Sequence, residues 1–303
     1  MNKQAILIMY HNDYYILERL LKQIDNKKFD IYLHVDKKNK NFDFEYTKSL
    51  LQESNLYYTK RLNVKWSTFS QIQCELQLLK ESSKKNYMYY HLISGVDMLL
   101  KDPNEIYDFF NKEKGKEFVA YQNQENTNKE YLERIKYYHI LNKNRRHQNK
   151  IIRTISTKIY YKTLSLQKKL KINRLKKYQL EIRKGANWFS ITDNLVKYVL
   201  TKEKEIYKIY RHSNCADELF IQTIVYNSRF KDNIYNQYQD EHQNIKRYID
   251  WNRGQPYTYT INDYKELMNS DCFFARKFSS TIDKEIIDKI YQNIKNKEWQ
   301  LWN

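Results

Sequence analysis

Ala5-Ile6-Leu7-Ile8-Met9 is an apolar run near the start of the chain, and Phe29-Asp30-Ile31-Tyr32-Leu33-His34-Val35 is a second run of strand-like composition. Between them, Tyr15–Ile24 carries apolar side chains at helical spacing. A strand, a helix and a strand within about 35 residues form a βαβ unit, whose two strands are parallel. This stretch predicts an α/β fold with a mainly parallel sheet.

Polar turns follow both of these strands. His11-Asn12-Asp13 comes after the first strand, and Asp36-Lys37-Lys38 comes after the second. Ligands of open α/β sheets bind outside the carboxyl ends of the strands, where both turns are expected. Asp36 is therefore a candidate ligand-binding residue, and a carboxylate that only caps the strand end is the alternative.

Strand-like and helical segments continue to alternate through the rest of the chain. Further strands are predicted at Tyr87–Ile93, Glu117–Tyr121, Gly185–Ile191 and Tyr248–Trp251. Further helices are predicted at Ile106–Phe110, Glu130–Leu141, Asp193–Leu200 and Asp263–Met268. No internal repeat or domain boundary is visible, so residues 1–303 are predicted to form a single domain with a basic helical insertion at about 141–178.

The net charge of +18 is concentrated in one segment. Lys143–Lys177 contains 13 Lys or Arg, and no acidic residue occurs between Glu133 and Glu181. Nucleic acid, an anionic membrane surface and an anionic substrate are chemically suitable partners. The segment is mostly aliphatic between its charges, which makes nucleic acid the poorer fit. Its isoleucines at helical spacing predict a helix on an anionic membrane surface, and a solvated basic insertion is the alternative.

The three cysteines, Cys74, Cys215 and Cys272, are far apart and form no Cys-x-x-Cys pair. They indicate neither a disulfide framework nor a zinc site, and they fit a reducing compartment. The apolar run near the N-terminus is too short for a signal sequence or a membrane span. We therefore expect a cytoplasmic protein, peripheral on the inner face of the cytoplasmic membrane if the basic segment binds lipid.

Two adjacent carboxylates stand in Ser213-Asn214-Cys215-Ala216-Asp217-Glu218-Leu219-Phe220-Ile221-Gln222. The apolar run that follows predicts a helix with one buried face, which Ser213 or Asn214 could cap. Neighbouring helical residues point in different directions, so Asp217 and Glu218 are expected to have different roles. One could cap the helix while the other faces a cleft. The alternative is that both are first-turn acids on a solvated helix end.

Several common catalytic motifs are absent from the sequence. It contains no GxGxxG or GxxxxGK[ST] phosphate loop, no HExxH and no GxSxG. His11, His34 and His91 lack metal-ligand spacing, so structural roles are expected for them. Nucleotide phosphates would then need cationic side chains, and Arg253 and Lys277 are candidates because they lie in turn-forming or apolar surroundings.

Six segments carry a resemblance to a known family in one order and spacing. They are His34–Lys38, Trp66-Ser67, Tyr89–Lys101 with Ser94-Gly95-Val96-Asp97, Gly185–Ser190, Ala216-Asp217-Glu218 and Phe274–Phe278. Together they resemble the core-2/I-branching β-1,6-N-acetylglucosaminyltransferase family, which also includes xylosyltransferases and bacterial members. The resemblance covers most of Ala5–Lys289, except roughly 141–178.

The resemblance implies an inverting glycosyltransferase that uses a UDP-sugar on an A-type nucleotide-sugar fold, with a mixed, mainly parallel sheet flanked by helices. Glu218 matches the catalytic base, and Arg253 and Lys277 match the basic pair that holds the donor diphosphate. The Arg253 match needs a one-residue gap, so Arg247 is its alternative. Asp36 matches an aspartate near the uridine.

The remaining matches concern the sugars. Asp97 matches a residue of the donor pocket, and Asp217 is assigned to orienting the helix end or to a donor hydroxyl. Glu133 is matched to an acceptor-binding glutamate. Trp188 and Trp251 are candidate sugar-stacking surfaces, with a structural role in the core as the alternative.

The resemblance leaves the sugar and the acceptor open. N-acetylglucosamine is the default donor sugar, and xylose, glucose and galactose are alternatives. The expected acceptor is a glycan or a lipid-linked oligosaccharide of bacterial surface polysaccharide synthesis. A basic nucleic-acid-binding protein and a non-catalytic sugar-binding relative are the alternative functions.

No cofactor or metal ion is expected. The chain contains no Asp-x-Asp motif, and the strand-end position reads Val35-Asp36-Lys37-Lys38, where two cations follow one carboxylate. Such a site would bind a second positive ion poorly. The sequence therefore predicts a metal-independent reaction in which fixed cations balance the diphosphate charge.

Overall fold

The computed structural model describes residues 2–121, 129–236 and 244–300. Within them, the central sheet has the strand order β3-β2-β1-β4-β6. Its strands are β1 (Gln4–Tyr10), β2 (Phe29–Val35), β3 (Asn55–Tyr58), β4 (Tyr89–Ser94) and β6 (Ser190–Thr192). The first four run parallel, whereas β6 pairs with β4 in the antiparallel sense. The predicted mixed, mainly parallel sheet is confirmed.

The βαβ unit forms as the sequence predicts. β1 and β2 pair along their whole length, with Gln4 opposite Phe29 and Tyr10 opposite Val35. α1 (Tyr14–Ile24) connects them and buries its apolar face against the sheet. Both strands are almost completely buried, which explains why they read as apolar runs rather than as alternating ones.

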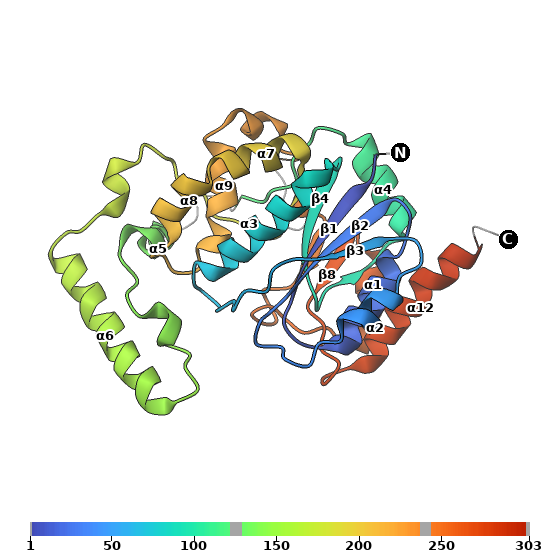
Figure 1. Cartoon of the computed structure of the whole chain (residues 1–303), viewed down its shortest axis with the longest axis horizontal. Helices are drawn as coiled ribbons and strands as arrows, with labels where there is room; N and C mark the ends of the chain where they lie inside the picture. Colours follow the sequence, from blue (N-terminus) through green and yellow to red (C-terminus); the bar gives the residue numbers. More distant parts are fainter. Residues whose placement is uncertain (1, 122–128, 237–243, 301–303) are drawn as a thin grey trace.

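Helices cover both faces of the sheet (Figure 1). Successive side chains of a strand point to opposite faces, so neighbouring residues enter different cores. In β1, Ala5 and Leu7 join the core under one helical layer, whereas Ile6 and Ile8 join the core under the other. One layer consists of α3 (Ser70–Ser82), α7 (Asp193–Thr201), α8 (Glu203–Tyr210) and α9 (Phe220–Tyr226), and the other of α1, α2 (Phe44–Ser49) and α4 (Pro103–Lys112).

A second, smaller sheet places the C-terminal motif beside the turn after β4. Its order is β5-β8-β7, with β5 (Met98–Leu99) antiparallel and β7 (Arg247–Ile249) parallel to β8 (Phe274–Arg276). α11 (Tyr264–Asn269) and α12 (Lys284–Gln300) pack against this sheet, and α12 also lies along α1.

The basic segment forms a helix of its own. α6 (Lys150–Lys169) lies at one end of the molecule in Figure 1, away from the central sheet and beyond the short helix α5 (Glu133–Lys136). Asn149 caps α6 by accepting hydrogen bonds from the backbone nitrogens of Ile151 and Ile152.

Three predicted segments differ from the structure. Glu117–Tyr121 makes only isolated bridges, at Glu117 and Phe118, because its apolar residues are buried without joining a ladder. Glu130–Leu141 is helical only to Lys136, since Tyr137 is extended. Of Gly185–Ile191, only the end enters β6.

Candidate active site

The carboxyl ends of β1, β2 and β8 lie close together. Burial lowers the pKa of His11, which follows β1, and the positive charges of Lys38 and Arg276 lower it further. The carboxylate of Asp36 acts on the same imidazole in the opposite sense. The turns after the first two strands and the end of β8 are therefore within electrostatic reach of one another, where the fold class places its ligands.

Asp36 is buried and holds the turn after β2. Its Oδ1 accepts a hydrogen bond from the backbone nitrogen of Lys38 at 2.8 Å, and its Oδ2 lies 3.4 Å from the ammonium of the same lysine. Arg61 donates to the backbone oxygen of Asp36 at 2.9 Å. These contacts describe a strand-end cap, and a role beside the uridine stays a prediction.

Asp97 links the turn after β4 to the end of β8. Its Oδ2 accepts from the backbone nitrogen of Ser94 at 2.9 Å, and its Oδ1 lies 3.8 Å from Nε of Arg276. Burial raises the pKa of the Asp97 carboxyl, although the Arg276 charge opposes that shift. The Arg276 guanidinium also stacks 4.1 Å from the ring centre of Trp188.

This stack changes the interpretation of Trp188. The indole is 7% exposed, and Arg276 covers one of its faces. The contacts of Trp188 are therefore those of a structural tryptophan in the core, which was the alternative. Trp251, in contrast, is 49% exposed in the loop after β7. Sugar stacking on Trp251 remains a prediction.

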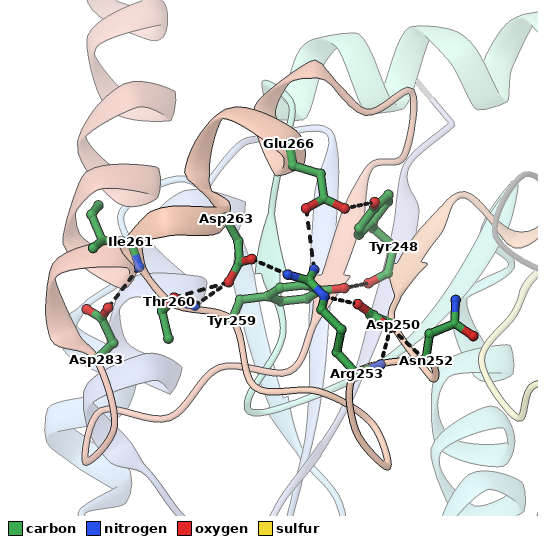
Figure 2. A network of polar contacts seen from close by, with 10 residues as sticks. All are labelled: Tyr248, Asp250, Asn252, Arg253, Tyr259, Thr260, Ile261, Asp263, Glu266 and Asp283. Atoms are coloured by element: carbon green, nitrogen blue, oxygen red, sulfur yellow. Dashed lines mark hydrogen bonds and ion pairs between the residues drawn. The ribbon is translucent and has the colours of Figure 1, made fainter.

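Arg253 lies in a cluster of carboxylates (Figure 2). Its guanidinium contacts Asp250, lies 2.6 Å from Asp263 and 3.3 Å from Glu266, and stacks on Tyr257. Three acids thus already balance its charge and tie the loop after β7 to α11. For Arg253 to hold a diphosphate, some of these contacts would have to break.

The alternative arginine, Arg247, is 1% exposed in the core. It donates to Oγ of Ser190 at 2.9 Å and to the backbone oxygens of Leu92 and Phe189, which joins β7 to β4 and β6. A guanidinium enclosed in this way cannot meet a ligand from solution. Lys277 follows Arg276, is partly exposed, and its ammonium pairs with no carboxylate in the described part of the chain.

Glu218 lies in a 3₁₀ turn, Ala216–Glu218, and not in the first turn of an α-helix as predicted. α9 begins only at Phe220, and neither Ser213 nor Asn214 caps it. Leu219 stands between the turn and α9 with a φ of −127°, outside helical geometry, so the turn stays separate from the helix. The Glu218 side chain is 31% exposed, and its Oε2 lies 2.5 Å from Nη1 of Arg134 in α5.

A close backbone contact fixes this turn. The backbone nitrogen of Gly185 donates to the backbone oxygen of Glu218 at 3.0 Å. A Cβ atom on Gly185 would lie 1.8 Å from the backbone oxygen of Ala120, so only glycine allows three chain segments to meet here.

Asp217 points into the protein and is 7% exposed. Its Oδ2 accepts from Nε2 of Gln71 in α3 at 2.7 Å. Burial, followed by the negative charge of Glu218, raises the pKa of Asp217 to about 7. Asp217 was expected either to orient the helix end or to bind a donor hydroxyl. Its contacts are those of a residue that orients the turn.

A second buried acid, Glu75, lies close enough to Asp217 to feel its charge. Glu75 lies one helical turn after Gln71 on α3, is 0% exposed, and neither of its carboxyl oxygens has a hydrogen-bond partner among the described residues. Burial raises the pKa of Glu75 well above its ordinary value, and the charge of Asp217 adds to the effect. Burial therefore favours the neutral form of the Glu75 carboxyl.

Glu133 and Arg134 are neighbours in the sequence but point to different partners. Glu133 pairs with Lys168 of α6 at 2.7 Å, whereas Arg134 reaches Glu218. The structure therefore places Arg134 nearer to the proposed base than Glu133, whose acceptor-binding role stays a prediction. Sequence reasoning missed Arg134, Gln71 and Arg276. The only signals for them were that Arg276 lies inside the matched segment Phe274–Phe278 and that Arg134 follows Glu133.

A groove of about 560 Å³ lies between α3 and α8, and its walls include Phe69, Leu76 and Tyr207. None of the predicted site residues lines it. The candidate site therefore rests on the arrangement of carboxylates and cations. Among the described residues, no cluster of three His, Cys, Asp or Glu side chains could hold a metal ion, and no helix is both long and apolar enough to cross a membrane.

A comparison with protein-family models matches residues 5–270 to the core-2/I-branching enzyme family. The chain belongs to the core-2/I-branching enzyme family. The resemblance seen in the sequence is thereby confirmed, including its relation to xylosyltransferases.

Curated relatives include xylosyltransferase 2 from Rattus norvegicus, 22% identical over 298 residues, and from Homo sapiens, 20% identical over 298 residues. Each match covers 90% of this chain and 31% of the relative, so the chain spans about a third of their length. Among solved structures, mouse xyloside xylosyltransferase 1 in its apo form matches 90% of this chain and 96% of its own, at 10% identity and a TM-score of 0.36.

Proposed function

We propose that this family member is an inverting glycosyltransferase that moves a sugar from a UDP-sugar to a hydroxyl of a glycan acceptor. The observation that supports it most is the setting of Glu218. Its Oε2 is held by Arg134, while its Oε1 has no hydrogen-bond partner in the described part of the chain. One oxygen is thus fixed, and the other is available to an acceptor hydroxyl.

The reaction follows from this arrangement. A sugar hydroxyl is a weak nucleophile, so a carboxylate must accept its proton while the oxygen attacks the anomeric carbon. The bond to the UDP oxygen breaks with its electron pair, and attack from the opposite side inverts the anomeric centre. Glu218 takes the proton, and Arg134 keeps the carboxylate in place.

The leaving diphosphate gains charge and needs cations already in position. Lys277 supplies one at the end of β8, and the neighbouring Arg276, whose side chain is 16% exposed, adds a second positive charge there. Arg253 would join them only after releasing its carboxylates. Asp36 and Asp97 are assigned to the nucleotide and sugar pocket. Since Asp36 pairs with Lys38, we propose that no metal ion or other cofactor is needed.

The donor sugar and the acceptor are part of the proposal. N-acetylglucosamine is the default sugar, and xylose is the first alternative because the curated relatives are xylosyltransferases. We assign the acceptor to bacterial surface polysaccharide synthesis, as a glycan or a lipid-linked oligosaccharide. A lipid-linked acceptor requires that the enzyme reach the inner membrane surface, and Lys143–Lys177 offers such a contact.

Glu218→Gln tests the central residue. The amide keeps the size of the side chain but cannot accept a proton, so sugar transfer is expected to fall by about two to four orders of magnitude. UDP release and UDP affinity are measured together, with the exposed Glu53→Gln as the charge-matched control. UDP affinity should stay nearly unchanged in both variants. Turnover above about a tenth of the wild-type value in Glu218→Gln would show that Glu218 is not the base.

A further inference from the structure

α6 exposes an aliphatic face to solvent. Its positions 152, 155, 159, 166 and 170, the last being the C-cap, are three, four, seven and four residues apart and therefore share one side of the helix. Their exposed fractions are 39% for Ile152, 52% for Ile155, 40% for Ile159, 55% for Leu166 and 63% for Leu170. Monomeric proteins rarely leave so long an aliphatic row uncovered.

Lysines run alongside this row. Lys158, Lys162 and Lys169 are exposed, and their spacings of four and seven residues place them on the adjoining side of the helix. The helix contains no acidic residue, and neither do its flanks from Arg134 to Leu180. The surface thus combines aliphatic side chains with charge of one sign.

The side of α6 that carries Tyr160 and Gln167 is occupied by the protein. The hydroxyl of Tyr160 hydrogen-bonds Nδ1 of His139 at 2.7 Å, and Gln167 bonds both backbone groups of Tyr138, at 2.7 and 2.9 Å. Lys168 pairs with Glu133. These contacts hold the helix with its aliphatic row facing outward.

We infer that α6 lies flat on an anionic lipid surface, with the aliphatic row in the boundary between headgroups and acyl chains. The chemistry of α6 favours a lipid surface over other partners. A bilayer rich in anionic lipid has negative headgroups for the lysines and an apolar interior for the aliphatic row. The helix is not apolar enough to cross the bilayer.

The same contacts connect the lipid surface to the candidate site. Tyr160 bonds His139, whose Nε2 bonds the backbone oxygen of Glu133, and Arg134 follows with its ion pair to Glu218. A bound membrane would therefore lie on the Arg134 side of the proposed base, where a membrane-borne acceptor could enter. This last step rests on the proposed function, whereas lipid binding itself is measured without donor or acceptor.

Vesicle sedimentation tests the inference on the full chain. The protein is expected to bind phosphatidylglycerol-containing vesicles, to release them as salt is raised, and not to bind pure phosphatidylcholine. Lys158→Gln/Lys162→Gln should weaken binding about fivefold per lysine, roughly 25-fold together. Ile155→Ser/Ile159→Ser should weaken it at least about tenfold.

Control variants show whether lipid binding depends on α6 itself or on any exposed lysine or isoleucine. Lys112→Gln/Lys114→Gln removes two exposed lysines next to the end of α4, and Ile282→Ser removes an isoleucine that is 61% exposed elsewhere, so both should bind as the wild type does. All variants alter exposed positions, and unchanged circular dichroism verifies their folding. Equal binding to neutral vesicles, or wild-type binding by both α6 variants, overturns the inference. Dimerisation that Ile155→Ser/Ile159→Ser abolishes, without lipid binding, would instead assign the face to a second copy.

Discussion

Lys277 and Arg253 differ in the charges around them, although the sequence motifs present both as donor-binding cations. Arg253 is surrounded by Asp250, Asp263 and Glu266, whereas no carboxylate of the described residues pairs with Lys277. A cation without a fixed counter-charge can give its full attraction to a diphosphate. Lys277 is therefore the stronger candidate of the two.

Lys277→Ala is expected to weaken both UDP binding and turnover, because an ammonium on the diphosphate would act on the ground state and the transition state alike. Calorimetric titration with UDP and steady-state kinetics measure the two effects. Lys265→Ala, an exposed lysine on α11, is the control. Unaltered UDP affinity in Lys277→Ala would remove this residue from the donor site.

At the same scale, Asp217 and Glu218 could be singled out as candidates from the sequence, because a carboxylate pair before an apolar run is a local signal. The residues that surround Glu218 and Asp217 could not be predicted from the sequence. Arg134 is 84 residues away along the chain, and Gln71 is 146 residues from Asp217. Such contacts depend on how α3, α5 and the turn at Ala216 pack together, and no local spacing encodes that packing.

α3 supports the candidate site as an element. Gln71 and Glu75 are four residues apart, so both face the turn that carries Asp217 and Glu218. Gln71 donates a hydrogen bond to Asp217, while Glu75 offers a neutral carboxyl in the buried space behind it. The Gln71 hydrogen bond keeps the Asp217 side chain inside the protein, whereas Glu218 lies on the solvent side.

Glu75 makes stability depend on pH. In the unfolded chain a glutamate releases its proton at a pKa of about 4.3. In the folded state the raised pKa of Glu75 means that the proton is kept to a higher pH. The folded state then binds more protons, so the free energy of unfolding falls as pH rises through this range, by up to about 1.4 kcal/mol per pH unit for one proton.

Glu75→Gln removes this titration, so its free energy of unfolding is expected to exceed that of the wild type increasingly as pH rises above about 4.3. Urea unfolding at several pH values measures the difference, and the exposed Glu53→Gln should show none. Parallel pH dependence in Glu75→Gln and the wild type would mean that Glu75 is ionised in the folded protein.

Elements with a strong pattern were predictable, and those set by tertiary contacts were not. The parallel pairing of β1 and β2 follows from two apolar runs and one helix between them. By contrast, Gly185 starts a predicted strand but donates its backbone hydrogen bond to Glu218, in the close approach to Ala120, and only the end of the segment joins the sheet as β6. Its apolar composition alone suggested a strand.

At the scale of the whole molecule, the two sheets and α6 give the candidate site its layout. The central sheet supplies the turns after β1, β2 and β4, and the smaller sheet brings Arg276 and Lys277 beside them. The turn with Glu218 stands between α3 and α5, and α6 is docked behind α5. The donor side and the acceptor side of the proposed reaction are thus built by different parts of the chain.

The most direct test of the proposed function is a panel of UDP-sugars with the wild-type chain, read by thermal shift and by UDP release in excess EDTA. A donor at about 100 times its dissociation constant should stabilise the folded state by roughly 2.7 kcal/mol. We predict that at least one UDP-sugar, with UDP-N-acetylglucosamine tested first, stabilises the protein and is turned over in EDTA, and that manganese does not raise the rate. No response to any UDP-sugar would contradict the glycosyltransferase assignment, and activity that EDTA abolishes and manganese restores would contradict the metal-free mechanism and the role of Lys277.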